Sequence, residues 1–233
     1  MQYFGGKAKI AKYIVPYLER VRKENQPYLE PFIGGANIIS KISGERYGCD
    51  FNEYLIEMYN GVKNGYELPD ELSKEQYIYL KYNNDTDKIL TGFVGFGCSY
   101  SAKWFGGYAL TDKGHVTCKG SKNSLLKKME TMQDVKFEWK DYKTLKPRGM
   151  LIYCDPPYIS NTQSTKQSYG VLNFDNVEFW NIMRKWSMNN DVYISEYEAP
   201  NDFKCVLEIE TQTSSRNGKY VYKRNEKLFT FDN

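Results

Sequence analysis

Four consecutive residues, Asp155, Pro156, Pro157 and Tyr158, carry the clearest chemical signal in the sequence. They follow directly on an apolar segment, residues 150–154, that is typical of a buried strand. In an open α/β sheet, ligands bind beyond the carboxyl ends of the strands, so the tetrapeptide stands where a reactive site belongs. The alternative interpretation is structural: a strand that ends at proline, with a capping aspartate.

This tetrapeptide suits the activation of an exocyclic amine on a base ring. The lone pair of such an amine is delocalised into the ring, which makes the amine a poor nucleophile. A carboxylate (Asp155) and a carbonyl held rigidly by Pro156 and Pro157 can accept both N–H groups, so that the lone pair points at an electrophile. Tyr158 offers a face on which a flipped-out base can stack. Asp155 need not be a strong base, because the proton can leave once the nitrogen has become cationic.

Two glycine-containing segments are candidates for holding a second ligand. Residues 30–36, Glu-Pro-Phe-Ile-Gly-Gly-Ala, lie at an expected strand-to-helix turn, where glycines let the backbone approach a ligand closely. Residues 3–7, Tyr-Phe-Gly-Gly-Lys, precede an expected helix, whose positive amino end suits a carboxylate. The sequence contains neither the Gly-x-Gly-x-x-Gly dinucleotide pattern nor a Gly-Lys-Ser/Thr phosphate loop, which argues against NAD enzymes and P-loop NTPases.

Asp50 ends the second expected strand. Its position is that of the acid that accepts hydrogen bonds from ribose hydroxyls in nucleoside-binding sheets. The alternative is that Asp50 caps the helix that follows. Spacing alone leaves both interpretations open.

The hydrophobic pattern predicts the elements that position these residues. Apolar residues three and four apart indicate helices over residues 7–23, 36–42, 55–62, 71–81, 88–96, 125–132 and 176–187. Short apolar runs bounded by proline, glycine or polar residues indicate strands at 28–32, 46–50, 135–139, 150–154, 191–195, 205–209, 219–222 and 227–231, with a turn at Gly218. Successive strand–helix units indicate a parallel sheet.

Composition excludes several classes of protein. The chain has 233 residues, 41% of them hydrophobic and 26% charged, with a mean hydropathy of −0.66. These values are typical of a globular protein and of neither a membrane bundle nor a disordered chain. The first residues lack the basic and apolar stretches of a secretory signal, so we expect a cytoplasmic location.

Histidine and cysteine usage narrows the chemistry. His115, the one histidine, lies in a Gly-Lys-rich stretch that reads as a solvated turn, which disfavours Ser-His and Cys-His hydrolases. The five cysteines, which never form a Cys-x-x-Cys pair, are expected to be reduced thiols. We therefore expect no metal site and no disulfide framework.

Charge is distributed unevenly. Residues 103–148 hold eleven basic and five acidic side chains, whereas residues 50–88 hold nine acidic and four basic ones. The basic segment begins with aromatic residues such as Trp104, so it could follow a phosphate backbone and offer stacking faces. Lys103, Trp104, Lys119 and Lys122 are the candidate contacts. A solvated lysine face with aromatic residues in the core is the competing interpretation.

The order of these segments resembles the DNA adenine-N6 methyltransferases of the Dam type, the alpha class of S-adenosyl-L-methionine-dependent amino-methyltransferases. That class runs from a Tyr/Trp-x-Gly-Gly-Lys loop through a Pro-Phe-x-Gly cofactor loop and a target-recognition insertion to Asp-Pro-Pro-Tyr. Residues 3–7, 31–34, an insertion over 64–120, and residues 155–158 follow that order here. The resemblance extends to residues 195–197 and 224–228. Ala36 is a departure, because many members have a third glycine there.

The resemblance implies a fold and a domain division. The fold is α/β: a Rossmann-like methyltransferase sheet with helices on both faces, and a mainly helical target-recognition insertion that contains a hairpin or loop. Residues 1–63 and 121–233 would form the catalytic domain, and residues 64–120 the inserted DNA-recognition lobe.

The resemblance also implies an activity and its residues. The enzyme would transfer a methyl group from S-adenosyl-L-methionine to N6 of a flipped-out adenine in double-stranded DNA, without a metal, as a monomer or weak dimer in a bacterial cytoplasm. Asp155, Pro156, Pro157 and Tyr158 would act on the target amine. The cofactor contacts would be Tyr3, Lys7, Phe32, Gly34, Asp50, Asp141 and Asp155.

Three alternatives stay open. A cytosine-N4 methyltransferase would use the same geometry, although serine is commoner there in place of Asp155. An RNA or protein-amide methyltransferase can carry a similar tetrapeptide, usually without such an insertion. A catalytically silent DNA-binding decoy belongs to a different class, and the intact Asp155, Tyr158, Lys7 and Asp50 speak against it.

Overall fold

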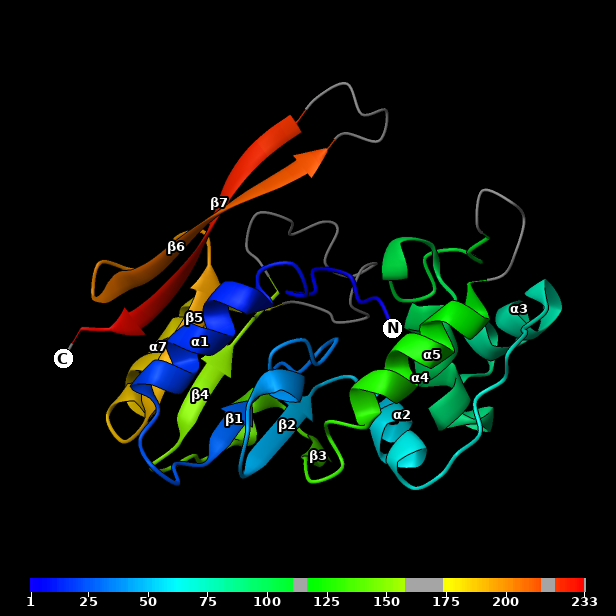
Figure 1. Ribbon diagram of the computed structural model, residues 1–233, viewed down its shortest axis with the longest axis horizontal. Helices are drawn as coiled ribbons and strands as arrows, with labels where there is room; N and C mark the ends of the chain where they lie inside the picture. The colour runs from blue at the N-terminus through cyan, green and yellow to red at the C-terminus, as the bar shows by residue number, and fades with distance from the viewer. Residues whose placement is uncertain (111–116, 158–173, 215–220, 233) are drawn as a thin grey trace.

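One mixed sheet organises the computed structural model, which describes residues 1–110, 117–157, 174–214 and 221–232 (Figure 1). Its strand order is β3-β2-β1-β4-β5-β7-β6. Strands β1 to β5 run parallel to one another, and β7 is antiparallel to both β5 and β6. The strands are β1 (Tyr28–Glu30), β2 (Arg46–Asp50), β3 (Lys136–Trp139), β4 (Leu151–Cys154), β5 (Asp191–Glu196), β6 (Phe203–Ser214) and β7 (Val221–Phe231).

The helices of the described residues are α1 (Ala11–Val21), α2 (Glu53–Lys63), α3 (Lys74–Tyr82), α4 (Lys88–Gly97), α5 (Cys118–Met129) and α7 (Asn176–Ser187). Short 3₁₀ turns are η1 (Ile39–Lys41), η2 (Asn84–Thr86), η3 (Tyr100–Ala102) and η4 (Tyr142–Thr144). Most of the predicted elements are therefore present, with ends shifted by a few residues.

The prediction of a helix at residues 36–42 is wrong. Only the turn η1 forms there, because Ala36 adopts a left-handed backbone with φ of +51° and the β-branched Ile38, Ile39 and Ile42 favour a helix less than unbranched residues do. The segments 219–222 and 227–231 were expected as separate strands, but from Val221 onward they belong to the single strand β7. The turn expected at Gly218 lies outside the described residues.

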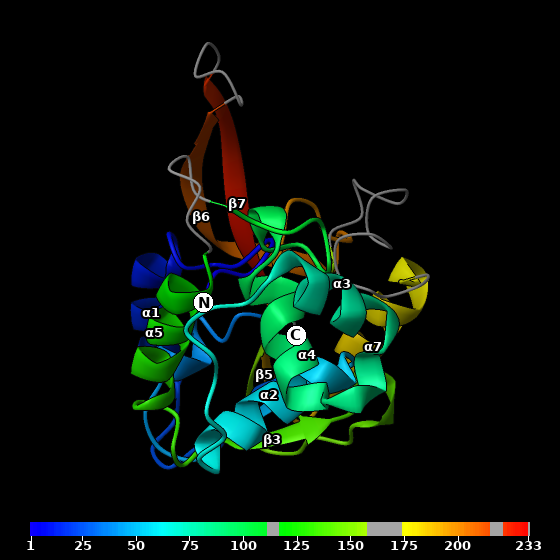
Figure 2. The same ribbon diagram turned by 90° about the vertical axis from the view of Figure 1, so that its right-hand side faces the viewer.

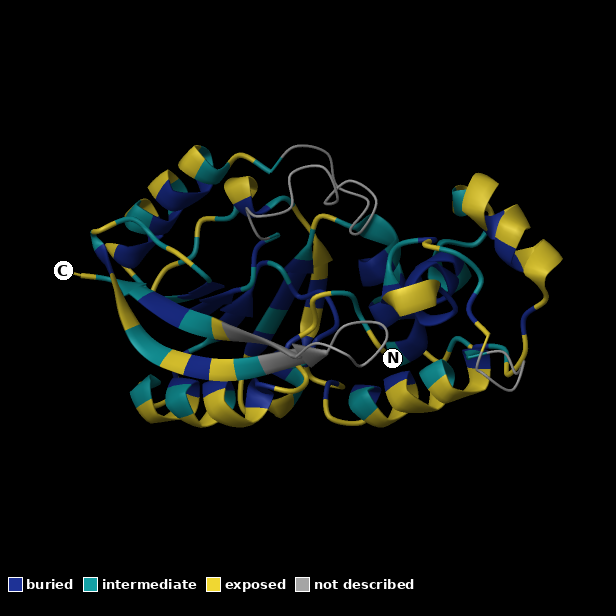
Figure 3. Cartoon of the chain, turned by 90° about the horizontal axis from the view of Figure 1, so that it is seen from above, coloured by how far each residue is buried: buried dark blue, intermediate teal, exposed yellow. Residues whose placement is uncertain are grey.

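Helices cover both faces of the sheet, which confirms the predicted α/β class. Successive residues of β4 point to opposite faces, as a strand requires. Leu151 and Tyr153 join the core under α1 and α5, whereas Ile152 and Cys154 join the core under α7. Seen from above, helices with exposed outer and buried inner faces flank the sheet on its two sides (Figure 3).

Helices α3 and α4 lie beyond the β3 edge of the sheet (Figure 1), and the turn η3 contacts α4. Helix α4 lies so close to α2 that a Cβ atom at Gly92 would be 2.0 Å from the Tyr54 carbonyl oxygen. An antiparallel bridge between Ser99 and Tyr108 closes a loop in this region. The division of the chain at residues 64 and 120 stays a prediction, and α5 runs across the second boundary.

The last two strands form a long hairpin. They pair from Phe203 with Phe231 to Ser214 with Val221, whereas β5 pairs with β7 only from Ile194 to Glu196. The hairpin consequently extends beyond the body of the sheet, as the side view shows (Figure 2). Its β7 strand also brings Glu226 to the edge of the sheet where β4 and β5 end.

Candidate active site

The sheet brings the predicted site residues to one edge. Asp50 is the last residue of β2, and Asp155 follows β4 directly. Because β1, β2 and β4 are parallel neighbours, these carboxylates and the loop after β1 lie together at the carboxyl ends of the strands. This side of the sheet is the edge that holds the candidate site. Pro156 is buried and Pro157 half-buried. Tyr158 lies outside the described residues.

Lys7 connects the N-terminal loop to Asp155. Its Nζ lies 2.8 Å from Asp155 Oδ1 and 3.9 Å from Glu226 Oε2, and it donates to the Gly5 carbonyl at 3.3 Å. The Lys7 side chain is 7% exposed and that of Asp155 is 20% exposed. Burial by itself lowers the pKa of Lys7, but the attraction of Asp155 and Glu226 outweighs burial and raises that pKa above its ordinary value. The ammonium is therefore charged at neutral pH, beside the proposed catalytic carboxylate.

The N-terminal loop also packs on the glycine loop after β1. A Cβ atom at Gly35 would lie 2.6 Å from Tyr3 Cβ, and one at Gly34 would lie 2.8 Å from Tyr3 Cε1. Gly34 has a φ of +44°, which favours glycine. Two segments that the sequence offered separately as ligand-holding loops are thus in direct contact, and their approach requires glycine.

Asp50 organises the same loop. Its Oδ2 accepts a hydrogen bond from Gly34 N at 3.0 Å, and its Oδ1 accepts one from Asn52 N at 2.9 Å. Burial raises the pKa of Asp50 to about 6, against the opposing effect of these backbone donors. The cap of α2 is Asn52, which accepts from Leu55 N at 3.2 Å. Asp50 is therefore not the helix cap that the sequence left as an alternative.

Aromatic side chains surround the ends of β1, β2 and β3. The ring of Phe32 lies 4.9 Å from that of Tyr142, centroid to centroid, and 5.9 Å from that of Phe179. Trp139 donates from Nε1 to the Phe51 carbonyl at 3.0 Å, and both side chains are more than half exposed. Lys140 N donates to the Asp50 carbonyl at 3.1 Å, which places Asp141 beside Asp50 along this edge. Asp141 Oδ1 accepts from Lys143 N at 3.0 Å.

Sequence reasoning assigned no role to Glu30, Phe51 and Glu226. Glu30 ends β1, is 2% exposed and accepts a hydrogen bond from the Tyr28 hydroxyl at 2.7 Å; burial raises its pKa to about 8. Phe51 follows Asp50 and exposes 54% of its surface. The available signals were an acid directly before Pro31 and an aromatic residue directly after Asp50. Glu226 belongs to a segment that carries the family resemblance, but its proximity to Lys7 depends on the path of β7.

The candidate DNA contacts do not form one free basic face. Trp104 packs against Tyr54 and Phe96, with ring centroids 5.5 and 4.9 Å apart. Lys122 Nζ lies 2.8 Å and Lys119 Nζ 3.6 Å from Asp70 carboxylate oxygens.

Lys103, the remaining candidate, lies over the Phe4 ring at 4.7 Å. Trp104 is half-buried among the rings of Tyr54 and Phe96, and the contacts with DNA expected of Trp104 and of the three lysines stay predictions. His115 lies outside the described residues.

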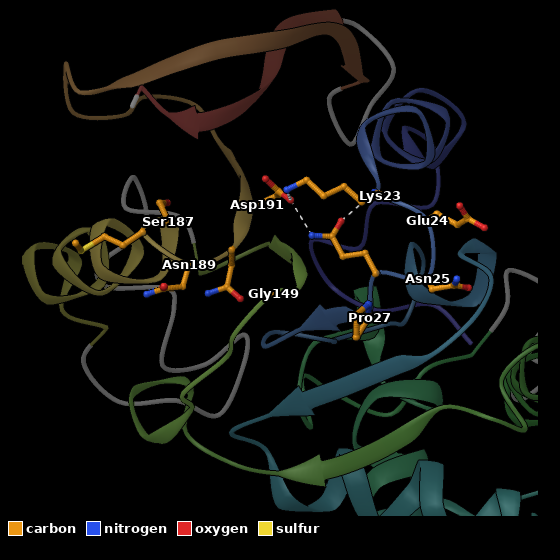
Figure 4. A pocket seen from close by; sticks show the side chains of 11 residues that line it. Lys23, Glu24, Asn25, Pro27, Gly149, Ser187, Asn189 and Asp191 are labelled. Atoms are coloured by element: carbon orange, nitrogen blue, oxygen red, sulfur yellow. Dashed lines mark hydrogen bonds and ion pairs between the residues drawn. The ribbon is translucent and has the colours of Figure 1, made fainter.

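A polar pocket lies at the other end of the sheet (Figure 4). It has a volume of about 520 Å³, and residues just before β1, β4 and β5 line it, among them Pro27, Gly149 and Asn190. Asp191, at its wall, accepts hydrogen bonds from Lys23 and Gln26, both at 2.7 Å. Because Asp155 and Asp50 lie at the carboxyl ends of their strands, this pocket is separate from the candidate active site.

The described residues contain neither a metal-binding cluster nor a membrane-spanning helix. No group of three or more histidine, cysteine, aspartate or glutamate side chains there is arranged to hold a metal ion. No helix within the described ranges has the length and apolar character to span a bilayer. The five cysteines are free thiols, and all except Cys205 are buried.

The chain resembles solved structures over most of its length, at low sequence identity. Solved structures similar over most of the chain include the rRNA methyltransferase aviRa from Streptomyces viridochromogenes, at 8% identity and a TM-score of 0.44, with 99% of this chain and 86% of that chain covered. Another is precorrin 8w decarboxylase from Methanobacterium thermoautotrophicum, at 10% identity and a TM-score of 0.40, with 97% and 90% covered. These likenesses are too distant to indicate a function. The search of curated proteins finds no match.

The informative match is to a family model. Residues 3–89, less than half of the chain, match the model of the D12 class N6 adenine-specific DNA methyltransferases. The matched range includes Tyr3, Lys7, Phe32, Gly34 and Asp50. It therefore contains both loops that meet at the candidate site. The chain is similar in this range to adenine methyltransferases, and methyl transfer is the chemistry that the similarity supports.

Proposed function

We propose that this protein is a Dam-type DNA adenine methyltransferase, which transfers a methyl group from S-adenosyl-L-methionine to N6 of a flipped-out adenine in double-stranded DNA. One observation carries the proposal: Lys7, the Gly34–Gly35 loop, Asp50 and Asp155 meet at one edge of the sheet. The match to the D12 class over residues 3–89 supports the same chemistry.

The residues at this edge fit the proposed cofactor. Gly34 and Gly35 let Tyr3 pack directly on the loop after β1, where a Cβ atom would clash with the Tyr3 side chain, so two of the segments proposed to hold the cofactor meet at this point. The carboxylate of Asp50 suits ribose hydroxyls, and the exposed ring of Phe51 beside it suits an adenine face. Tyr3, Lys7, Phe32 and Asp141 would complete the contacts. When bound, S-adenosyl-L-methionine supplies an electrophilic methyl group.

Asp155 would act on the target amine. Its carboxylate and the carbonyl of buried Pro156 are acceptors that can hold the two amine N–H groups and direct the nitrogen lone pair. Lys7, 2.8 Å from Oδ1, favours the ionised form of that carboxylate, which is the form able to accept from the amine. Once methylated, the cationic nitrogen would lose one proton to water by way of the Asp155 carboxylate, with S-adenosylhomocysteine as the other product. Tyr158 would provide the stacking face for the base.

DNA would lie over the lobe and this edge of the sheet. Lys103 and, on α5, Lys119 and Lys122 are proposed to contact phosphates, and the half-buried Trp104 next to Lys103 is proposed to contact the DNA as well. The enzyme is proposed to work as a monomer or weak dimer. We propose that it acts in the bacterial cytoplasm, where DNA and S-adenosyl-L-methionine are both present.

The test is to incubate the protein with unmethylated DNA and S-adenosylmethionine carrying a deuterated methyl group, and to analyse the nucleosides by mass spectrometry. Asp155→Asn is compared with Asp191→Asn, which removes a carboxylate at the opposite end of the sheet. We expect labelled N6-methyladenine from the wild type and the Asp191 variant, and loss of about a thousandfold in the Asp155 variant.

Any result other than labelled N6-methyladenine would change a specific part of the proposal. Labelled N4-methylcytosine would keep the mechanism and change the base. Label in RNA in competition with DNA would change the substrate class. DNA binding without any label would favour the catalytically silent decoy, and full activity of Asp155→Asn would contradict the mechanism.

A further inference from the structure

Three residues from distant parts of the chain meet at the proposed site. Lys7 precedes α1, Asp155 follows β4, and Glu226 lies in the antiparallel strand β7. Lys7 Nζ is 2.8 Å from Asp155 Oδ1 and 3.9 Å from Glu226 Oε2. The Glu226 side chain is 14% exposed, so this second carboxylate is also largely withdrawn from water.

The two carboxylates contact Lys7 in different ways. The 2.8 Å distance to Asp155 is that of a charge-assisted hydrogen bond, whereas 3.9 Å to Glu226 exceeds hydrogen-bond length and leaves an electrostatic attraction. Glu226 thus helps to balance the buried ammonium, while Asp155 is the nearer of the two carboxylates. Its other oxygen, Oε1, lies 3.4 Å from the Tyr197 hydroxyl, which helps to fix the carboxylate.

We propose that Glu226 is a positioning residue, which holds the Lys7 ammonium in its ion pair with Asp155 and thereby keeps Asp155 oriented for the target amine. This inference rests on the proposed function for its catalytic consequence. The attraction of Glu226 also contributes to the raised pKa of Lys7. Glu226 acts through Lys7 and need not touch substrate or cofactor.

The kinetic test compares Glu226→Gln, which keeps the shape and removes the charge, with Glu208→Gln on the exposed side of the same hairpin. Glu208 accepts a hydrogen bond from Asn225 at 2.7 Å, so both variants lose the charge of a glutamate that has a polar partner. We expect Glu226→Gln to lower kcat about tenfold, with KM values for DNA and cofactor within about twofold of wild type. Glu208→Gln should match the wild type. An unchanged kcat in Glu226→Gln would overturn the inference.

A double-mutant cycle tests whether Glu226 acts through Lys7. In a Lys7→Met background the additional Glu226→Gln change should lower kcat by less than about twofold, because the residue that it positions is already absent. If the two changes multiply as independent effects, Glu226 has some other role and the inference fails.

The rate at which Lys7 is acetylated does not depend on catalysis, so its measurement tests this inference separately from the proposed function. Acetic anhydride modifies lysines according to their accessibility and free-amine fraction, and mass spectrometry gives the rate for each lysine. We expect the rate of Lys7 relative to exposed Lys9 to rise at least about threefold in Glu226→Gln and to stay unchanged in Glu208→Gln. A wild type that cannot methylate DNA would refute the proposed function alone. An unchanged Lys7 rate would refute the positioning role whatever the activity.

A second variant tests the same inference if Glu226→Gln does not fold. Tyr197→Phe removes the hydroxyl that lies against Glu226 Oε1 and keeps the ring. It should raise the relative acetylation rate of Lys7 in the same direction by about 1.5- to 2-fold. A folded Tyr197→Phe protein with the wild-type Lys7 rate would contradict the inference.

Discussion

The Lys7 ammonium lies 2.8 Å from a carboxylate oxygen of Asp155, so the loop at the start of the chain is bound to the end of the central strand β4. The pair is largely buried, and removal of one partner leaves a charge with poorer compensation.

Stability measurements on this pair should show strong coupling. We expect Lys7→Met or Asp155→Asn alone to lower the free energy of unfolding by about 2 kcal/mol, and the double variant to lose less than the sum of the two. Urea denaturation at pH 7 measures all four proteins. Strict additivity would show that the ion pair makes no coupled contribution to stability.

Cofactor binding should depend on the ionisation of Asp50. Burial raises its pKa to about 6, so Asp50 is ionised at pH 7.5 and mostly protonated at pH 5, where it accepts ribose hydroxyls less well. Calorimetric titration with S-adenosylhomocysteine should give a Kd about tenfold weaker at pH 5 than at pH 7.5. Asp50→Asn should bind weakly at both pH values. The same pH dependence in that variant would place the titrating group elsewhere.

The contact between Tyr3 and the glycine loop predicts a position-specific effect of added methyl groups. Gly35→Ala places a Cβ 2.6 Å from Tyr3 Cβ, and it should cost about 1–3 kcal/mol of stability and weaken cofactor binding. Gly120→Ala in α5 meets nothing within 4 Å and should stabilise the protein by up to about 1 kcal/mol. Thermal unfolding and cofactor titration measure both. Equal behaviour of the two variants would contradict the packing described here.

The buried carboxyl group of Glu30 should make the free energy of unfolding depend on pH. Burial raises its pKa to about 8, so from about pH 4.5 to pH 8 the folded protein retains a proton that the unfolded chain releases. The free-energy contribution of Glu30 to folding therefore falls as pH rises through this range. We would measure the free energy of unfolding of Glu30→Gln and of wild type at pH 5 and pH 8. The difference between the two proteins should shift in favour of Glu30→Gln at pH 8. Glu208→Gln is the exposed control, and a pH-independent difference for Glu30→Gln would refute the prediction.

Asp70 should compete with DNA for two lysines. It pairs with Lys122 at 2.8 Å and Lys119 at 3.6 Å, so Asp70→Asn would release both for phosphates. We expect DNA binding at low salt to tighten about two- to threefold, with the gain disappearing at high salt.

Asp232→Asn, which removes the exposed partner of Lys204, controls for the change in net charge. Fluorescence anisotropy with labelled duplex DNA measures both variants. An equal gain in the two would show that only net charge matters.

The sequence predicted the parts of the fold that follow from local patterns. Apolar periodicity located β1, β2, β4 and β5 and helices α1, α2 and α7, and the rule that ligands bind at the carboxyl ends of parallel strands placed Asp50 and Asp155 at one edge. The same reasoning failed at residues 36–42, because the periodicity of Ile38, Ile39 and Ile42 does not reveal the left-handed backbone at Ala36. Trp104, a predicted DNA contact, is half-buried and packs against Tyr54 and Phe96, and its contact with DNA stays a prediction.

By itself the sequence determined which residue types could do chemistry and at which strand ends they lie, since both depend on neighbours along the chain. Only the tertiary structure decided that Tyr3 covers Gly34 and Gly35 and that Lys7 lies between Asp155 and Glu226. Those contacts depend on the strand order and on the path of the antiparallel β7, which the spacing of residues does not encode. Burial of Lys7 and Glu30 is decided in the same way, because it requires side chains from several elements to exclude water together.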